Sequence, residues 1–71
     1  MSSDVREKFA NKLKNIRNER SLSQENLALL CGIDRTYIGR LERLERNPSL
    51  EILQKIADGL NIKLYDLLKF D

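Results

Sequence analysis

The segment SQENLALLCGIDRTYIGRLER (residues 23–43) decides the fold. Ser23 suits a helix N-cap, because its hydroxyl can accept a hydrogen bond from a free backbone N–H of the first turn, and Glu25 suits the positive end of the helix dipole. The buried side of this helix is expected to be Leu27, Ala28 and Leu30, and Gly32 can take the positive φ that ends the helix. Only Gly32 and Ile33 separate it from a second N-cap, Asp34. Two short helices joined by so tight a glycine turn predict a helix-turn-helix.

Three further helices are expected around this pair. The first, about residues 4–19, carries one apolar stripe at helical spacing, made of Val5, Phe9, Leu13 and Ile16. After Pro48, Ser49 caps a helix that ends at Asn61, and its inward residues are expected to be Leu50, Leu53, Ile56, Ala57 and Leu60. A short last helix spans about residues 64–69. The chain is therefore expected to be all-α, a compact five-helix bundle that forms one domain over residues 1–71.

The composition disfavours an enzyme. The chain has one cysteine and no histidine, so a zinc site and the Cys–His and Ser–His–Asp catalytic sets are excluded, and no cofactor is expected. Cys31 stands alone, which fits a reducing cytoplasm and a buried structural thiol. No apolar run approaches the ~18 residues of a membrane span, and the N-terminus lacks the apolar stretch of a signal peptide. A cytoplasmic protein without a membrane partner is expected.

Positive charge gathers in the first two thirds of the chain. The formal net charge is only +2, but residues 35–47 hold four arginines against two glutamates, whereas residues 51–71 hold three lysines against four acidic residues. This distribution allows one basic face and one neutral or acidic face. A basic face on a helix-turn-helix predicts double-stranded DNA as the partner.

The outer face of the predicted helix 35–43 carries residues suited to reading DNA. Because Ile38, Leu41 and part of Tyr37 face inward, the other face presents Arg35, Thr36, Gly39, Arg40 and Arg43. An arginine can donate two hydrogen bonds to a guanine, and a threonine offers a hydroxyl and a methyl group to base edges. The N-terminal end of such a helix points into the major groove. Gly39, which lacks a side chain, would allow a close approach to the DNA.

Two polar residues outside that face have separate interpretations. Gln24, in the first turn of the preceding helix, could hold a phosphate beside free backbone N–H groups, or it could be an ordinary exposed residue at a helix start. Glu42 is expected to pair with a nearby arginine such as Arg17, because a carboxylate that faced DNA phosphates would be repelled.

Four stretches resemble the Cro/phage-repressor, or XRE-type, helix-turn-helix family: residues 22–28 (LSQENLA), 31–38 (CGIDRTYI), 41–43 (LER) and 46–50 (RNPSL). The resemblance covers about residues 8–69. Within the family, residues 34–38 (DRTYI) together with Arg46-Asn47 look most like the controller proteins of restriction–modification systems. The resemblance implies a compact five-helix fold, a homodimer and a bipartite operator.

The resemblance also implies roles for individual residues. It places Arg35, Thr36 and Tyr37 at the DNA-reading end of the helix, Gln24 at a phosphate, and Arg46 and Asn47 in a loop beside the DNA backbone and minor groove. Together with the residues themselves, it predicts base contacts from Arg35, Thr36, Tyr37 and Arg40. Contacts to the DNA backbone are expected from Gln24, Arg43, Arg46 and Asn47.

One residue departs from the family pattern. Family members usually have a glycine where this chain has Leu44. Glycine suits a left-handed helix end, whereas leucine has a steric cost at positive φ. Either the helix continues into Leu44-Glu45, or the loop takes another course, and the position of Arg46 depends on which occurs.

The C-terminal third is rich in apolar residues. Seven apolar or aromatic residues fall within residues 60–70: Leu60, Ile62, Leu64, Tyr65, Leu67, Leu68 and Phe70. One short helix cannot bury all seven, and an apolar patch that stays exposed usually marks a partner surface. We expect a two-fold homodimer with Ile62, Tyr65 and Phe70 at the interface, while Leu64, Leu67 and Leu68 face the chain's own core. Such a dimer would place two reading helices roughly 34 Å apart, one turn of DNA, on a pseudo-palindromic site.

The leading functional hypothesis is a sequence-specific, homodimeric transcriptional regulator. An antitoxin of a toxin–antitoxin pair is an alternative, but it would need a toxin-binding tail. A protein-interaction adaptor of the same fold is another, but it would not need base-reading residues such as Arg35 and Thr36. No small-molecule effector is expected, since the chain is too short for a separate effector domain.

Overall fold

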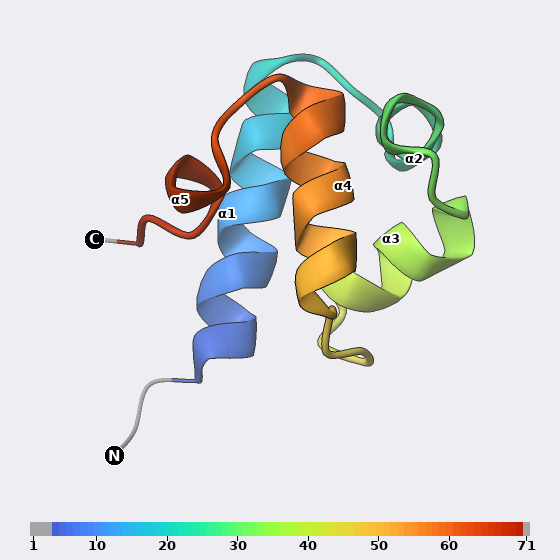
Figure 1. The fold of residues 1–71 in the computed structure, drawn as a ribbon. Helices are drawn as coiled ribbons and strands as arrows, with labels where there is room; N and C mark the ends of the chain where they lie inside the picture. Colours follow the sequence, from blue (N-terminus) through green and yellow to red (C-terminus); the bar gives the residue numbers. More distant parts are fainter. Residues whose placement is uncertain (1–3, 71) are drawn as a thin grey trace.

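The computed structural model describes residues 4–70 and confirms the all-α prediction within them. The helices are α1 (Val5–Glu19), α2 (Gln24–Cys31), α3 (Arg35–Glu42), α4 (Leu50–Leu60) and α5 (Leu64–Leu67). Helix α2 packs against α3 and α4, α1 packs against α3 and α5, and α5 also contacts α4. Figure 1 shows α5 on one side of α1 and the α2–α3 pair on the other side of α4. No helix in this part of the chain is long and apolar enough to cross a membrane.

The predicted N-caps lie at the helix starts. The hydroxyl of Ser23 accepts from the backbone N–H of Asn26 at 3.0 Å, and that of Ser49 accepts from the N–H of Ile52 at 3.1 Å. These bonds satisfy donors that a helix leaves free in its first turn. Asp34 precedes α3 as expected, but its side chain makes no capping hydrogen bond.

Four helices end through a residue in the left-handed conformation. The φ angles are 57° at Ser21, 68° at Gly32, 66° at Leu44 and 58° at Asn61. In each case the following N–H bonds back five residues into the helix, as Ile33 does to the carbonyl of Ala28 at 3.0 Å. This is the Schellman ending, which satisfies carbonyls that would otherwise lack a partner. Gly32 and Asn61 were predicted in this role, whereas Ser21 was not.

Leu44 adopts the conformation that glycine has in the family, so both expected alternatives were wrong. Helix α3 ends at Glu42, Leu44 takes the positive φ, and the N–H of Glu45 donates to the carbonyl of Arg40 at 2.8 Å. A non-glycine residue in this region costs roughly 1–2 kcal/mol. The side chain of Leu44 is half-buried, so packing and the two helix-end hydrogen bonds offset that cost.

The core lies between the helices, and most predicted inward residues are in it. The fully buried large side chains are Leu13, Leu27, Ile38, Leu41, Ile56, Leu60 and Leu67. Three predictions were wrong, since Leu30 on α2 is 53% exposed, Leu50 is 74% exposed and Leu68 is 36% exposed. Leu50 is the first residue of α4, where a side chain leans back past the end of the core. Helix α5 ends at Leu67 instead of residue 69, which leaves Leu68 outside it.

The contact between α2 and α4 depends on a glycine. A Cβ at Gly59 would lie 2.6 Å from the Sγ of Cys31 and 2.8 Å from both the Cα of Cys31 and the carbonyl oxygen of Leu30. Cys31 is buried as expected, and burial raises the pKa of its thiol. A raised pKa keeps the thiol protonated and unreactive, which agrees with a structural role.

Candidate nucleic-acid interface

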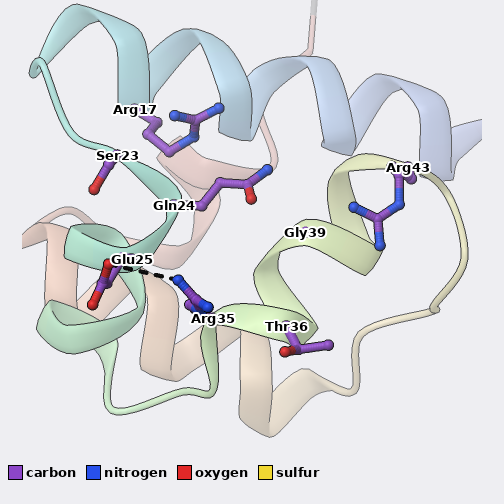
Figure 2. Close-up of a pocket in the computed structure, with 8 residues that line it drawn as sticks. All are labelled: Arg17, Ser23, Gln24, Glu25, Arg35, Thr36, Gly39 and Arg43. Carbon is purple, nitrogen blue, oxygen red and sulfur yellow. Dashed lines mark ion pairs between the residues drawn. The ribbon is translucent and has the colours of Figure 1, made fainter.

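An open groove of about 570 Å³ lies where α1, α2 and α3 meet. Its lining residues are Arg17, Ser23, Gln24, Glu25, Arg35, Thr36, Gly39 and Arg43. Figure 2 shows them distributed along the groove, with Arg35 and Thr36 at the first turn of α3 and Arg43 at its far end. Three arginines line the groove, Arg17 from α1, Arg35 from α3 and Arg43 directly after α3, and each of them is paired with a glutamate. Among the described residues, no group of His, Cys, Asp and Glu could hold a metal ion.

A hydrogen-bonded cluster around Glu42 forms the floor of the groove. The carboxylate of Glu42 accepts from the Nε and Nη2 atoms of Arg17 at 2.8 and 3.0 Å and from the amide of Gln24 at 2.9 Å. Arg17 also donates to the carbonyl of Leu22 at 3.0 Å. The predicted Arg17–Glu42 pair is therefore confirmed, and it ties α1, α2 and α3 together where DNA would approach.

Gln24 belongs to this floor and is half-buried. Its amide nitrogen donates to Glu42, so a phosphate at this position would share the amide with a carboxylate. From the sequence, Gln24 was expected only at a phosphate or at an exposed helix start, so this contact with Glu42 was not predicted.

The first turn of α3 presents two exposed side chains that suit base edges. Arg35 and Thr36 both point outward, and the guanidinium of Arg35 lies 3.7 Å from the carboxylate of Glu25. The side chains of this pair are 69% and 64% exposed, so water screens the attraction and the pair is weak. Arg35 can therefore exchange Glu25 for another partner at little cost.

Gly39 is covered by side chains of its own chain. It is buried, and a Cβ there would lie 3.1 Å from the Nη1 of Arg43 and 3.4 Å from the Oε1 of Gln24. The side chains of Arg43 and Gln24 therefore lie over Gly39 in the free protein, and the close approach to DNA at this position stays a prediction. Arg43 is held there by Glu45, whose carboxylate accepts from its Nε at 3.0 Å.

The remaining predicted residues lie outside the groove. Arg40 is exposed on α3, Tyr37 is half-buried against the core, and Arg46 and Asn47 are exposed in the loop between α3 and α4. The structure therefore brings Gln24, Arg35, Thr36 and Arg43 into one groove. Arg17, Ser23 and Glu25 also line the groove and were not predicted to line it. Ser23 and Glu25 flank Gln24 in the sequence, and Arg17 was predicted only as the partner of Glu42.

The residues expected at a dimer interface differ in exposure. Tyr65 is 68% exposed, whereas Ile62 and Phe70 are half-buried and pack against the core of their own chain. Leu68, which was assigned to the core, shares an apolar hollow of about 200 Å³ with Val5, Phe9, Pro48 and Leu53. The exposed apolar surface near α5 therefore includes Leu68 and Val5 as well as Tyr65.

Known proteins resemble this chain in sequence and in structure. The helix-turn-helix family model HTH_3 matches residues 13–67. The control protein C.MunI from a Mycoplasma species is 46% identical over 65 residues, which cover 90% of this chain and 88% of that protein. The crystal structure of the restriction-modification controller protein C.AhdI from Aeromonas hydrophila has a TM-score of 0.83 and 44% identity, and the match covers 87% of this chain and 94% of C.AhdI.

A structure with DNA is also similar. The C.Esp1396I tetramer in complex with its natural 35 base-pair operator gives a TM-score of 0.83 at 34% identity, over 94% of this chain and 92% of that chain. The resemblance to XRE-type proteins is confirmed, because the family model spans most of the chain and C.MunI matches along nearly its whole length. This chain belongs to the helix-turn-helix family HTH_3, among the control proteins that C.MunI and C.AhdI represent.

Proposed function

We propose that the chain is a sequence-specific DNA-binding regulator of transcription that acts in the cytoplasm as a homodimer, in the manner of restriction–modification controllers. The observation that carries the proposal is the first turn of α3, where Arg35 and Thr36 are exposed at the edge of a groove lined by three arginines. The floor of that groove fixes α3 against α1 and α2, so the two side chains are held by a rigid frame. The similar C.Esp1396I structure, which contains operator DNA, supports the same reading.

In this proposal the N-terminal end of α3 enters the major groove. Arg35 donates two hydrogen bonds to a guanine, and Thr36 contacts a neighbouring base edge. Arg40 and the exposed part of Tyr37 extend the base contacts along the same helix. Phosphates are bound by Arg43, with further backbone contacts from Gln24, Arg46 and Asn47.

Replacing Arg35 with alanine tests the base-reading role. The Arg35→Ala variant should bind a duplex selected by the wild-type protein with about 1–3 kcal/mol less free energy, and it should lose discrimination at one base pair. Gel-shift titration against the selected duplex and its single-base variants measures both effects. Lys55→Ala is the control, since it removes one positive charge from the exposed face of α4. Equal affinity of Arg35→Ala and wild type for the selected duplex would refute the assignment.

We propose that the dimer forms through α5 and the apolar surface beside it. Tyr65 is the exposed anchor on α5, and the exposed Leu68 and Val5, which line one hollow, extend the proposed interface together with the accessible parts of Ile62 and Phe70. Exposed aromatic and aliphatic residues of this kind lose water contact when a second copy covers them.

Sedimentation equilibrium tests the dimer. The Tyr65→Glu variant should raise the dimer dissociation constant about tenfold or more, because a buried interface aromatic commonly contributes over 1 kcal/mol. Leu29→Glu is the matched control, since Leu29 is 75% exposed on α2, away from the proposed interface. A wild-type protein of monomer mass at high micromolar concentration would contradict the dimer, and an equal effect of both variants would contradict its location.

A further inference from the structure

Glu45 forms an ion pair with Arg43, the groove-lining arginine that directly follows α3. The Oε2 of Glu45 accepts from the Nε of Arg43 at 3.0 Å, and its Oε1 accepts from the Nη2 at 3.5 Å. The two side chains are 50% and 57% exposed, respectively, so the pair is open to solvent and to any incoming anion. The carboxylate thus occupies the Nε and Nη2 donors of Arg43, with which the arginine could bind an anion in the groove.

The backbone places Glu45 in this position. The left-handed conformation of Leu44 turns the chain back, and the N–H of Glu45 is fixed to the carbonyl of Arg40. The hydrogen bond from Arg43, and to a smaller extent the charges of Arg43 and Arg40, lower the pKa of the Glu45 carboxyl. Glu45 is therefore a carboxylate at neutral pH, on a loop whose course is set by the helix ending.

A carboxylate and a phosphate bind a guanidinium in the same two-pronged way. Resting on the proposed DNA-binding function, we propose that Glu45 competes with a DNA backbone phosphate for Arg43 and thereby lowers the affinity of the protein for all DNA sequences. A phosphate that binds Arg43 must displace Glu45 and then lie beside its negative charge. Both effects oppose binding, and neither depends on the base sequence.

The other acidic residues of the groove are placed differently. Glu42 is buried and accepts three hydrogen bonds from Arg17 and Gln24, so it is a fixed part of the floor. Glu25 approaches Arg35 only at 3.7 Å, at the base-reading end. Glu45 alone combines two hydrogen bonds to a proposed phosphate-binding arginine with an exposed position, which is the geometry of an exchangeable partner.

The Glu45→Gln variant tests the competition. Its dissociation constant should fall about fivefold, the upper range for one exposed ion pair, both on a duplex selected by the wild-type protein and on an unrelated duplex of equal length. The plot of log affinity against log salt should steepen by up to about 0.9, the value for one phosphate charge, because Arg43 then neutralises its phosphate without the opposing charge of Glu45. Fluorescence anisotropy at four salt concentrations measures both quantities. Asp58→Asn, which makes the same charge change on the exposed face of α4, should leave both nearly unchanged.

A double-mutant cycle separates competition from general repulsion. In an Arg43→Gln background, Glu45→Gln should tighten binding clearly less than in the wild type, since the competition for Arg43 is gone and only the repulsion between Glu45 and the phosphate remains. An equal tightening in both backgrounds would refute the proposal, as would weaker binding of Glu45→Gln to the selected duplex. If the wild-type protein binds no duplex, the proposed function fails with it; if the wild type binds and Glu45→Gln is unchanged, only this inference fails.

Discussion

The Glu42→Ala variant is expected to lose about 3 kcal/mol of unfolding free energy, because breaking a buried ion pair from one side costs roughly 3–5 kcal/mol. Glu42 is only 7% exposed and accepts hydrogen bonds from Arg17 and Gln24. Its removal leaves a guanidinium and an amide without their acceptor inside the groove floor. The low end of the range applies, since Arg17 keeps its bond to the carbonyl of Leu22. Urea unfolding followed by circular dichroism measures the loss.

Two further variants define the cause of that loss. Glu19→Ala removes an exposed carboxylate near the end of α1 and should stay within about 0.5 kcal/mol of the wild type. The double variant Arg17→Met with Glu42→Leu should recover part of the loss, because it leaves no uncompensated charge in the floor. A loss below 1 kcal/mol for Glu42→Ala would mean that the cluster contributes little and that apolar packing alone fixes α3.

The Gly59→Ala variant is expected to be destabilised by about 2 kcal/mol. Overpacking a tight contact costs up to about 3 kcal/mol, and the better helix propensity of alanine returns about 1 kcal/mol. Two of the three atoms that the new Cβ would meet, the Cα of Cys31 and the carbonyl oxygen of Leu30, are backbone, so α2 and α4 must move apart. The melting temperature should fall by roughly 10 °C in a domain of this size.

The control for Gly59 is a substitution on the same helix. Lys55→Ala, at an exposed position of α4, should leave the melting temperature nearly unchanged. Adding Cys31→Ala to Gly59→Ala should restore only part of the stability, since it removes the Sγ contact and keeps the two backbone contacts. A Gly59→Ala protein as stable as the wild type would show that the two helices can separate without cost.

Local chemistry explains why the helix boundaries could be predicted from the sequence. The caps at Ser23 and Ser49 and the left-handed endings at Gly32 and Asn61 each depend on a few neighbouring residues. The Arg17–Glu42 pair was predictable for a different reason, because a carboxylate on a DNA-binding helix needs a partner away from the phosphates. The helix boundaries thus follow from neighbouring residues, and the pair follows from the need to keep Glu42 away from phosphates.

The wrong predictions concern burial and backbone conformation at positions where contacts with segments distant in the sequence determine the outcome. Spacing placed Leu50 and Leu68 on inward faces, but spacing cannot tell where the core ends along a helix. Spacing also did not predict that the side chains of Arg43 and Gln24 pack over Gly39. Leu44 shows the same limit for the backbone: its propensity disfavours a positive φ, and the packing and hydrogen bonds of the helix ending override that preference.

The four left-handed helix endings have an evolutionary consequence. Only one of them uses glycine, so serine, leucine and asparagine occupy conformations that glycine would enter with less strain. Natural chains often retain such unused gains in stability. Ser21 lies outside the groove, so a glycine there can offset a destabilising change elsewhere without altering DNA contacts. Leu44 adjoins Arg43 and Glu45, so the same substitution at that ending would change stability and binding strength together. A stabilising substitution can therefore be selected at Ser21 without a change in DNA binding, whereas at Leu44 stability and DNA binding change together.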